Sequence, residues 1–162
     1  MRDEITRVRQ LRASKRHAEH LAAACALAEA MPDDAEARLE AAYGLDRAGE
    51  ERRAFVHYEA VHRLGVPAHE HRHFTVGYGS TLRNIGRHDE AVAVFARAVA
   101  DDPDYPPFAA FLALALHTAG RSQDALATLL RCALDAARPD AFDGYERALA
   151  EYQRALTLDT GE

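Results

Sequence analysis

The residue pattern with the clearest chemical potential is HEHRH at residues 69–73, a literal H-E-x-x-H sequence. On a helix, His69 and His73 would share one face and hold a zinc ion, with Glu70 as general base for an attacking water. Pro67 lies two residues before His69, so the motif falls at the start of a helix, and spacing marks no third ligand. The primary prediction therefore contains no metal. The alternative is a zinc-dependent hydrolase or metal-binding protein that uses the stretch His69, Glu70, His71, Arg72 and His73.

No other motif in the sequence indicates catalysis. The chain contains no Gly-rich phosphate loop, and Ser80 and Ser122 lack the strand-to-helix turn that exposes a hydrolase nucleophile. The acidic pairs at residues 33–34 and 101–102 fall at expected helix boundaries, where helix capping explains them better than acid–base chemistry. We therefore predict no enzymatic activity, no catalytic residue and no cofactor.

The elements that would position such residues follow from a repeated pattern. Turn glycines occur at Gly49, Gly86 and Gly120, which gives spacings of 37 and then 34 residues. Four kinds of residue recur around these glycines. The small residues before each turn are Ala42, Gly79 and Ala113, and the alanines after it are Ala54, Ala91 and Ala125. The large residues that follow are Tyr58, Phe95 and Leu129, and the further small or apolar residues are Val61, Ala98 and Cys132. Small residues let two helices approach closely, and the large residue fills the gap between them. The pattern therefore predicts packed helix pairs.

The sequence predicts a single all-α domain at residues 1–162. We expect a degenerate first helix pair at 1–33, repeats at 34–66, 69–103 and 105–138, and a C-terminal capping helix at 140–158. In the first pair, helices are expected at 2–13 and 17–30, with Lys15 in the place of a turn glycine, although one bent helix over residues 1–30 stays open. The capping helix is expected from Ala141 to Leu158, with an apolar stripe of Phe142, Tyr145, Leu149, Tyr152 and Leu156.

Self-similarity at about 34 residues, with a turn glycine and a closing proline, is typical of tetratricopeptide repeats, and residues 35–140 resemble that family. Three segments are similar to the bacterial tetratricopeptide repeat group 5 family: AAYGLDRAGEERRAFVHYEAVHRLGVP, GYGSTLRNIGRHDEAVAVF and FLALALHTAGRSQDAL. The resemblance implies a right-handed superhelix of antiparallel helix pairs, in a stand-alone bacterial domain that mediates protein contacts or dimerises. It implies no reaction. The tryptophan of a generic repeat is missing, and Arg38, Thr75 and Ala109 occupy its positions.

Charge and hydropathy exclude two classes of partner. The formal net charge of −6 provides no general basic face for nucleic acid. No segment approaches the roughly 18 consecutive apolar residues of a membrane span. Six Arg or Lys residues between Arg2 and Arg16 accompany Asp3 and Glu4. We interpret them as a solvated helix face, and a basic arm that contacts an acidic partner is the alternative.

The amino terminus and the cysteines indicate the compartment. Ile5, Val8 and Leu11 are spaced by three rather than gathered in an apolar block, which is unlike a signal peptide. Cys25 and Cys132 lie on expected apolar helix faces and form no disulfide framework. These observations predict a cytoplasmic protein.

The inner surface of the stacked hairpins is the expected binding site. Counting from the turn glycines, the inner positions outside the packing stripe are Tyr43, Asp46, Arg47, His73, Ser80, Arg83, Asn84, Phe111, His117 and Thr118. Arg83 and Asn84 would together bind the carboxylate or backbone of a peptide. We predict a non-enzymatic interaction module or scaffold that binds a peptide or partner-protein segment in this groove. A homodimer formed through Phe142, Tyr145 and Tyr152 is a further alternative.

Overall fold

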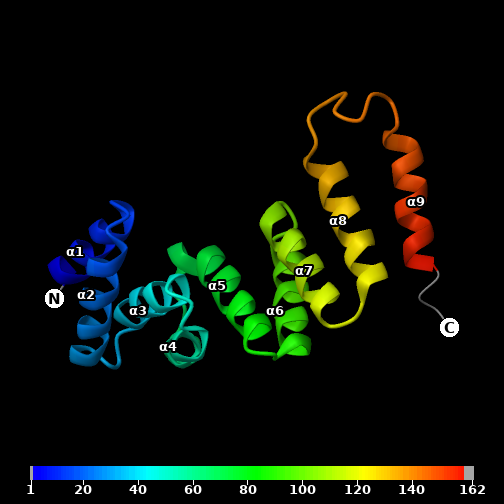
Figure 1. Cartoon of the computed structure of the whole chain (residues 1–162). Helices are drawn as coiled ribbons and strands as arrows, with labels where there is room; N and C mark the ends of the chain where they lie inside the picture. The colour runs from blue at the N-terminus through cyan, green and yellow to red at the C-terminus, as the bar shows by residue number, and fades with distance from the viewer. Residues whose placement is uncertain (1, 159–162) are drawn as a thin grey trace. The chain divides into compact units, whose positions relative to one another are not determined.

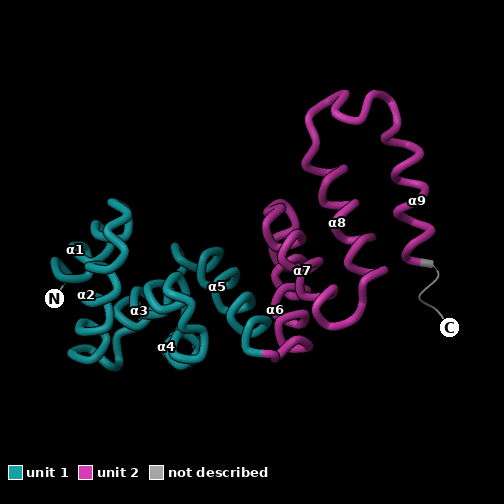
Figure 2. The backbone as a smooth tube through the Cα atoms, in the orientation of Figure 1, with its two compact units in different colours: residues 1–85 teal, residues 86–162 magenta. Residues whose placement is uncertain are grey.

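The chain is all-α. The computed structural model describes residues 2–158, and within that range every regular element is a helix (Figure 1). The chain divides into two compact units, residues 1–85 and residues 86–162 (Figure 2). The all-α helical repeat fold predicted from the sequence is therefore confirmed. No helix in the described range has the length and apolar character needed to cross a membrane.

In its described residues, unit 1 contains five α-helices and one short 3₁₀ turn. They are α1 (Arg2–Ala13), α2 (His17–Ala30), α3 (Ala35–Arg47), α4 (Glu51–Leu64), η1 (Ala68–Glu70) and α5 (His71–Asn84). The amino-terminal region thus forms two helices. Between them, Lys15 has a positive φ of 57°, the conformation that glycine adopts at the turns of the later repeats. Each helix packs on the next, and α3 also contacts both α1 and α5. The odd-numbered helices of unit 1 therefore line a common face.

The local chemistry of unit 1 explains its turns. Gly49 has a φ of 75° between α3 and α4, and Gly65 has a φ of 101° at the end of α4, a region that favours glycine. Asp34 caps α3, because its side chain accepts a hydrogen bond of 2.9 Å from the Ala37 amide. At the other expected acidic cap, which lies in unit 2, Asp101 instead binds Arg97 at 2.6 Å within α6 (His88–Asp101).

Unit 2 is a series of four helices, each packed on its neighbour in the chain: α6 (His88–Asp101), α7 (Pro106–Thr118), α8 (Ser122–Ala136) and α9 (Glu146–Leu158). The expected start of the last helix at Ala141 is wrong by five residues. Asp140, Asp143 and Gly144 have φ values of 61°, 50° and 84°, which an α-helix cannot contain. The chain therefore forms turns up to Tyr145.

The predicted packing register holds in two of the three repeats. Tyr58 and Phe95 are fully buried, and an aromatic ring that follows sixteen residues later covers each of them. Phe74 lies 5.8 Å from Tyr58, and Phe111 lies 5.7 Å from Phe95. Leu129, at the corresponding position of the third repeat, is instead 48% exposed, so its predicted burial is wrong. The residue sixteen positions later is Tyr145, which precedes α9 and does not cover it.

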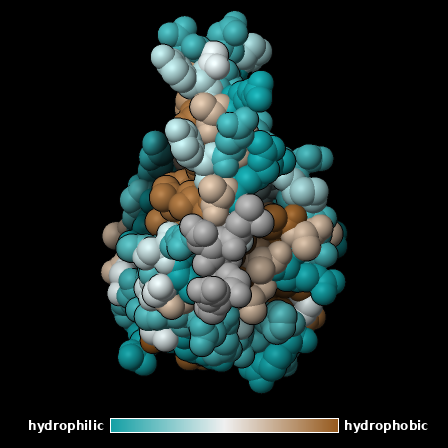
Figure 3. All heavy atoms as spheres, turned by 90° about the vertical axis from the view of Figure 1, so that its right-hand side faces the viewer, coloured by the Kyte–Doolittle hydropathy of each residue, from teal (hydrophilic) through white to brown (hydrophobic). Residues whose placement is uncertain are grey.

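The later start of α9 also changes its apolar stripe. Tyr145 and Tyr152 are 66% and 68% exposed, whereas Gln153 is buried on the side of α9 that faces α8. Apolar side chains reach the surface among polar ones in the view from the right-hand side of Figure 1 (Figure 3). The tyrosines are thus on the surface, and the homodimer proposed to use them stays a prediction.

A close contact between α4 and α5 generates a stability prediction. A Cβ atom at Gly77 of α5 would overlap the Tyr58 hydroxyl of α4 and lie 2.8 Å from Tyr58 Cζ. We expect Gly77→Ala to lower the free energy of unfolding by about 2 kcal/mol, although alanine favours helix formation, because overpacking forces the two helices apart. Urea denaturation of the full chain measures this change.

Gly44→Ala is the matched comparison, because Gly44 also lies inside a helix and its Cβ would meet Leu21 Cδ1 at 3.2 Å and the Leu21 Cα atom at 3.3 Å. We expect it to cost less than Gly77→Ala, because neither distance is as short as those to Tyr58. In the Tyr58→Phe background, Gly77→Ala should cost less, since the overlapping oxygen is gone. Equal costs for the two glycines would show that Tyr58 does not restrict the approach of α5.

Candidate functional site

The HEHRH stretch does not lie on one α-helix. Residues 68–70 form the 3₁₀ turn η1, and α5 begins at His71. His69 and His73 are exposed; His69 Nε2 lies 3.3 Å from Arg9 Nη2, and His73 Nδ1 lies 3.6 Å from Glu70 Oε2. Among the described residues, no three His, Cys, Asp or Glu side chains are grouped as a metal site. The geometry expected for the H-E-x-x-H motif, an uninterrupted α-helical turn, is therefore absent from residues 69–73.

Glu70 is a structural residue in this arrangement. Its carboxylate is buried, Oε1 accepts a hydrogen bond from Arg12 Nη2 at 3.3 Å, and Oε2 accepts one from the Tyr43 hydroxyl at 3.1 Å. A general base must face a water molecule beside the metal. Glu70 is instead buried and bound by Arg12 and Tyr43, and no three metal ligands are grouped in the described residues, so the hydrolase alternative gains no support from the geometry.

A second buried acid, Glu40 of α3, joins the same cluster. Glu40 is 1% exposed and accepts hydrogen bonds from Arg12 Nη2 at 3.0 Å and Arg9 Nε at 3.4 Å. His20 of α2, also buried, places Nε2 at 2.9 Å from Glu40 Oε2. We call His20, Glu40, Glu70, Arg9 and Arg12 the ionic cluster. Neither interpretation of the basic segment applies to Arg9 and Arg12, because they bind acids of their own chain.

Tyr43 links the ionic cluster to a cavity. The Arg12 guanidinium lies 4.6 Å above the Tyr43 ring, a cation–π contact. Burial raises the pKa of Tyr43 far above its usual value, and the charge of Glu70 raises it further. The hydroxyl therefore stays neutral and donates to Glu70 at any physiological pH.

The cavity, which we call the unit 1 cavity, has a volume of about 390 Å³ and lies on the face shared by α1, α3 and α5. Its lining residues are Arg12, His20, Tyr43, Asp46, Arg47, Tyr58, His73, Val76 and Gly77. The cavity thus brings together the predicted site residues of α3 with His73 of α5. Arg12, His20 and Tyr58 were missed, because they belong to helices or packing positions that the sequence analysis did not assign to the inner face.

The polar groups of the unit 1 cavity differ in how they are satisfied. Burial raises the pKa of Asp46, although a hydrogen bond from Thr81 Oγ1 at 3.4 Å acts in the opposite direction. The Arg47 side chain is exposed and makes no hydrogen bond or ion pair with the described residues. The hydroxyl of Tyr58 is buried and makes no close hydrogen bond in the described chain, and Asp46 is the acceptor that it faces. The cavity therefore offers both donors and acceptors.

The other predicted site residues lie outside this cavity. In α5, the Ser80 hydroxyl is buried without a hydrogen-bond partner in the described chain, and Arg83 Nη2 donates to Asn84 Oδ1 at 3.2 Å. The three residues of unit 2 make local contacts: Phe111 packs on Phe95, His117 Nδ1 lies 3.0 Å from Ser122 Oγ, and Thr118 Oγ1 donates to the Leu114 carbonyl at 2.8 Å. Phe111 is thus a packing residue rather than a free inner residue.

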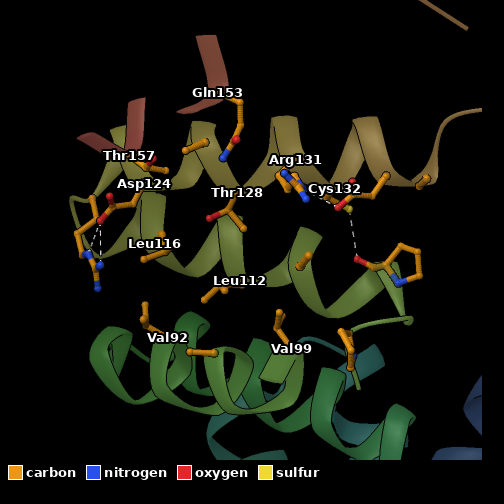
Figure 4. Close-up of a pocket in the computed structure, with 18 of the residues that line it drawn as sticks. Val92, Val99, Leu112, Leu116, Asp124, Thr128, Arg131, Cys132, Gln153 and Thr157 are labelled. Carbon is orange, nitrogen blue, oxygen red and sulfur yellow. Dashed lines mark hydrogen bonds and ion pairs between the residues drawn. The ribbon is translucent and has the colours of Figure 1, made fainter. Parts of the chain in front are cut away.

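Unit 2 contains an apolar groove that the sequence analysis missed. It has a volume of about 690 Å³ and lies between α6, α7, α8 and α9. Val92 and Val99 of α6 line one side, Leu112 of α7 lies between, and Thr128 and Arg131 of α8 line the other side (Figure 4). Val92, Ala96 and Val99 follow the packing residues of α6 by one position, and this second stripe was the available signal.

The ionic cluster generates a second stability prediction. Glu40→Ala leaves His20 and Arg12 without their shared buried partner, so we expect a loss of about 3 kcal/mol in the free energy of unfolding, measured by urea denaturation. Glu36→Ala is the matched control: Glu36 is one helical turn earlier, 33% exposed, and 3.5 Å from Arg9 Nη2. It should cost less than about 1 kcal/mol. Similar losses for the two variants would contradict a dominant role for Glu40.

One comparison with known proteins identifies the family of this chain. A family model described as "Tetratrico peptide repeat" matches residues 35–156, which is more than half of the chain. No curated protein matches the chain. Among solved structures, a match is described as "Crystal structure of YrrB: a TPR protein with an unusual peptide-binding site", with 17% identity, a TM-score of 0.39, and coverage of 94% of this chain and 90% of that chain. The chain therefore belongs to the tetratricopeptide repeat family, of the group 5 type, whose members are generally non-catalytic modules for protein–protein interaction.

Proposed function

We propose that the chain binds an extended segment of a partner protein in the unit 1 cavity and along the adjoining face of α5. The supporting observation is that two groups line the same cavity: Arg47, a donor without a partner in the described chain, and Asp46, an acceptor bound there only by hydroxyl groups. A peptide backbone needs both kinds of group, because each residue carries a donor and an acceptor. The chain would align the segment and perform no reaction on it.

The face of α5 extends the proposed site beyond the cavity. His73, Gly77, Ser80 and Asn84 are spaced by four, three and four residues, so they form one stripe along the helix. The Ser80 hydroxyl is buried between them and lacks a hydrogen-bond partner in the described chain, and Arg83 lies beside Asn84. A segment that begins in the unit 1 cavity would pass His73 first and Arg83 and Asn84 last. The role of Arg83 and Asn84 in binding is thus retained as part of the proposal.

A peptide library displayed on phage and selected on the full chain tests the proposal. We expect Arg47→Ala and His73→Ala each to weaken an enriched peptide about tenfold, because both side chains are exposed at the cavity and free to contact it. Arg154→Ala, an exposed arginine of α9, is the matched control and should leave the affinity unchanged. Fluorescence anisotropy with the labelled peptide measures all four proteins.

A specific binding result would contradict the proposed site in unit 1. A peptide whose affinity is unchanged by both unit 1 substitutions, and is lost on Thr128→Arg in the apolar groove of unit 2, would overturn the proposed site. Circular dichroism of each variant checks that helicity is retained, since none of these substitutions removes a buried contact.

A further inference from the structure

Asp46 is a partly buried carboxylate without a counter-ion. It lines the unit 1 cavity, forms no ion pair in the described chain, and accepts a hydrogen bond there from Thr81 at 3.4 Å. Burial raises its pKa, and the neighbouring charge of Glu51 raises it further. The hydroxyls of Thr81 and Tyr58 lower it, and the charge of Arg47 lowers it least among the causes. Arg47 therefore provides little compensation, which agrees with its exposed position. An uncompensated charge in a partly buried site destabilises the folded chain.

The hydroxyl of Tyr58 lies beside Asp46 at the inner end of the cavity. Tyr58 is fully buried and lines the cavity, and its oxygen lies against Gly77, another lining residue. Its hydroxyl makes no close hydrogen bond in the described chain, and Asp46 is the acceptor that it faces. Burial raises the pKa of Tyr58 far above its usual value, and Asp46 raises it further, so the group is a neutral hydroxyl that can donate its proton to Asp46 and keeps its lone pairs for another donor.

None of the basic side chains that line the cavity forms an ion pair with Asp46 in the described part of the chain. Arg12 already binds Glu40 and Glu70 and stacks on Tyr43. His20 lies 2.9 Å from Glu40, and His73 lies 3.6 Å from Glu70. Arg47 is at the exposed edge of the cavity. The inner part of the unit 1 cavity thus carries an anion that is bound by hydroxyl groups alone, with Val76 as an aliphatic wall.

We infer that the unit 1 cavity receives a basic side chain, lysine or arginine, of the bound partner segment, with Asp46 as its ion-pair partner. This inference rests on the proposed function and specifies the chemistry of the partner. The cationic N–H groups donate to Asp46 and to the lone pairs of the Tyr58 hydroxyl, and the methylene groups pack against Val76. Arg47 stays at the edge of the cavity, where it can donate to a main-chain carbonyl of the segment.

A residue reserved for a ligand should behave differently from a structural one on substitution. Asp46→Asn retains the shape and the acceptor for Thr81 and removes the unpaired charge. We therefore expect the melting temperature at pH 7 to rise by about 2 °C while binding of the cation is lost. A fall in the melting temperature of Asp46→Asn would show that the carboxylate stabilises the fold, and would overturn the inference.

The binding test uses small probes of defined charge on the full chain. The probes are N-acetyl-lysine N-methylamide, its arginine counterpart, and the neutral norleucine derivative, each titrated at millimolar concentration and followed by amide chemical shifts. We expect at least one basic probe to shift signals of α3 and α5, the norleucine derivative to shift none, and Asp46→Asn to weaken the basic probe about tenfold. Tyr58→Phe should weaken it by a smaller factor.

Glu51→Gln is the matched control. It removes a negative charge that acts on Asp46 without changing the lining of the cavity, so the basic probe should bind with nearly the same affinity. Equal losses for Glu51→Gln and Asp46→Asn, or equal shifts with norleucine, would overturn the inference. Selected peptides that bind through Arg47 and His73 but tolerate Asp46→Asn would overturn it while the proposed function stands. If the basic probes bind in the unit 1 cavity but no peptide is selected, the result would overturn the proposal that the chain binds an extended partner segment, and the cation site itself would stand.

Discussion

The hydrogen bonds of Arg12 are the constraint on which unit 1 depends. One guanidinium nitrogen reaches Glu40 of α3 at 3.0 Å and Glu70 before α5 at 3.3 Å, so α1 fixes the separation of two other helices. Removing the partner of a buried carboxylate strongly destabilises the folded chain, because the carboxylate is no longer hydrated and its charge would be left uncompensated. The ionic cluster therefore determines where α3 and α5 lie on the shared face, and the unit 1 cavity is the space that this arrangement leaves.

Sequence analysis predicts the helices of this chain well because their signals are local. A turn glycine, a small residue and a large residue lie within a dozen positions of one another, and each has a separate physical reason. The ionic cluster has no such signal: Arg12 is 28 positions from Glu40 and 58 from Glu70. In the sequence alone, these charges look like ordinary solvated residues. The exposed face and the buried cluster are distinguished only when the helices are packed.

The two errors of register have one common cause. A spacing of sixteen residues places Phe74 on Tyr58 and Phe111 on Phe95, and it would place Tyr145 on Leu129. The positive φ angles before Glu146 delay the last helix and leave both Leu129 and Tyr145 exposed. Likewise, the H-E-x-x-H spelling assumes a continuous helix that the 3₁₀ turn at residues 68–70 interrupts. Residue spacing predicts contacts only while the element that carries it is unbroken.

Two acids of α3 illustrate how structure and function divide the same helix. Glu40 has His20, Arg9 and Arg12 as partners, so its charge is balanced inside the chain. Asp46, six residues later, has no ion-pair partner in the described chain, although burial opposes its ionisation. Packing alone would favour an amide or an apolar residue at that position, since neither requires a counter-ion. The carboxylate is understandable if its counter-ion arrives from another molecule, which is what an interaction module needs.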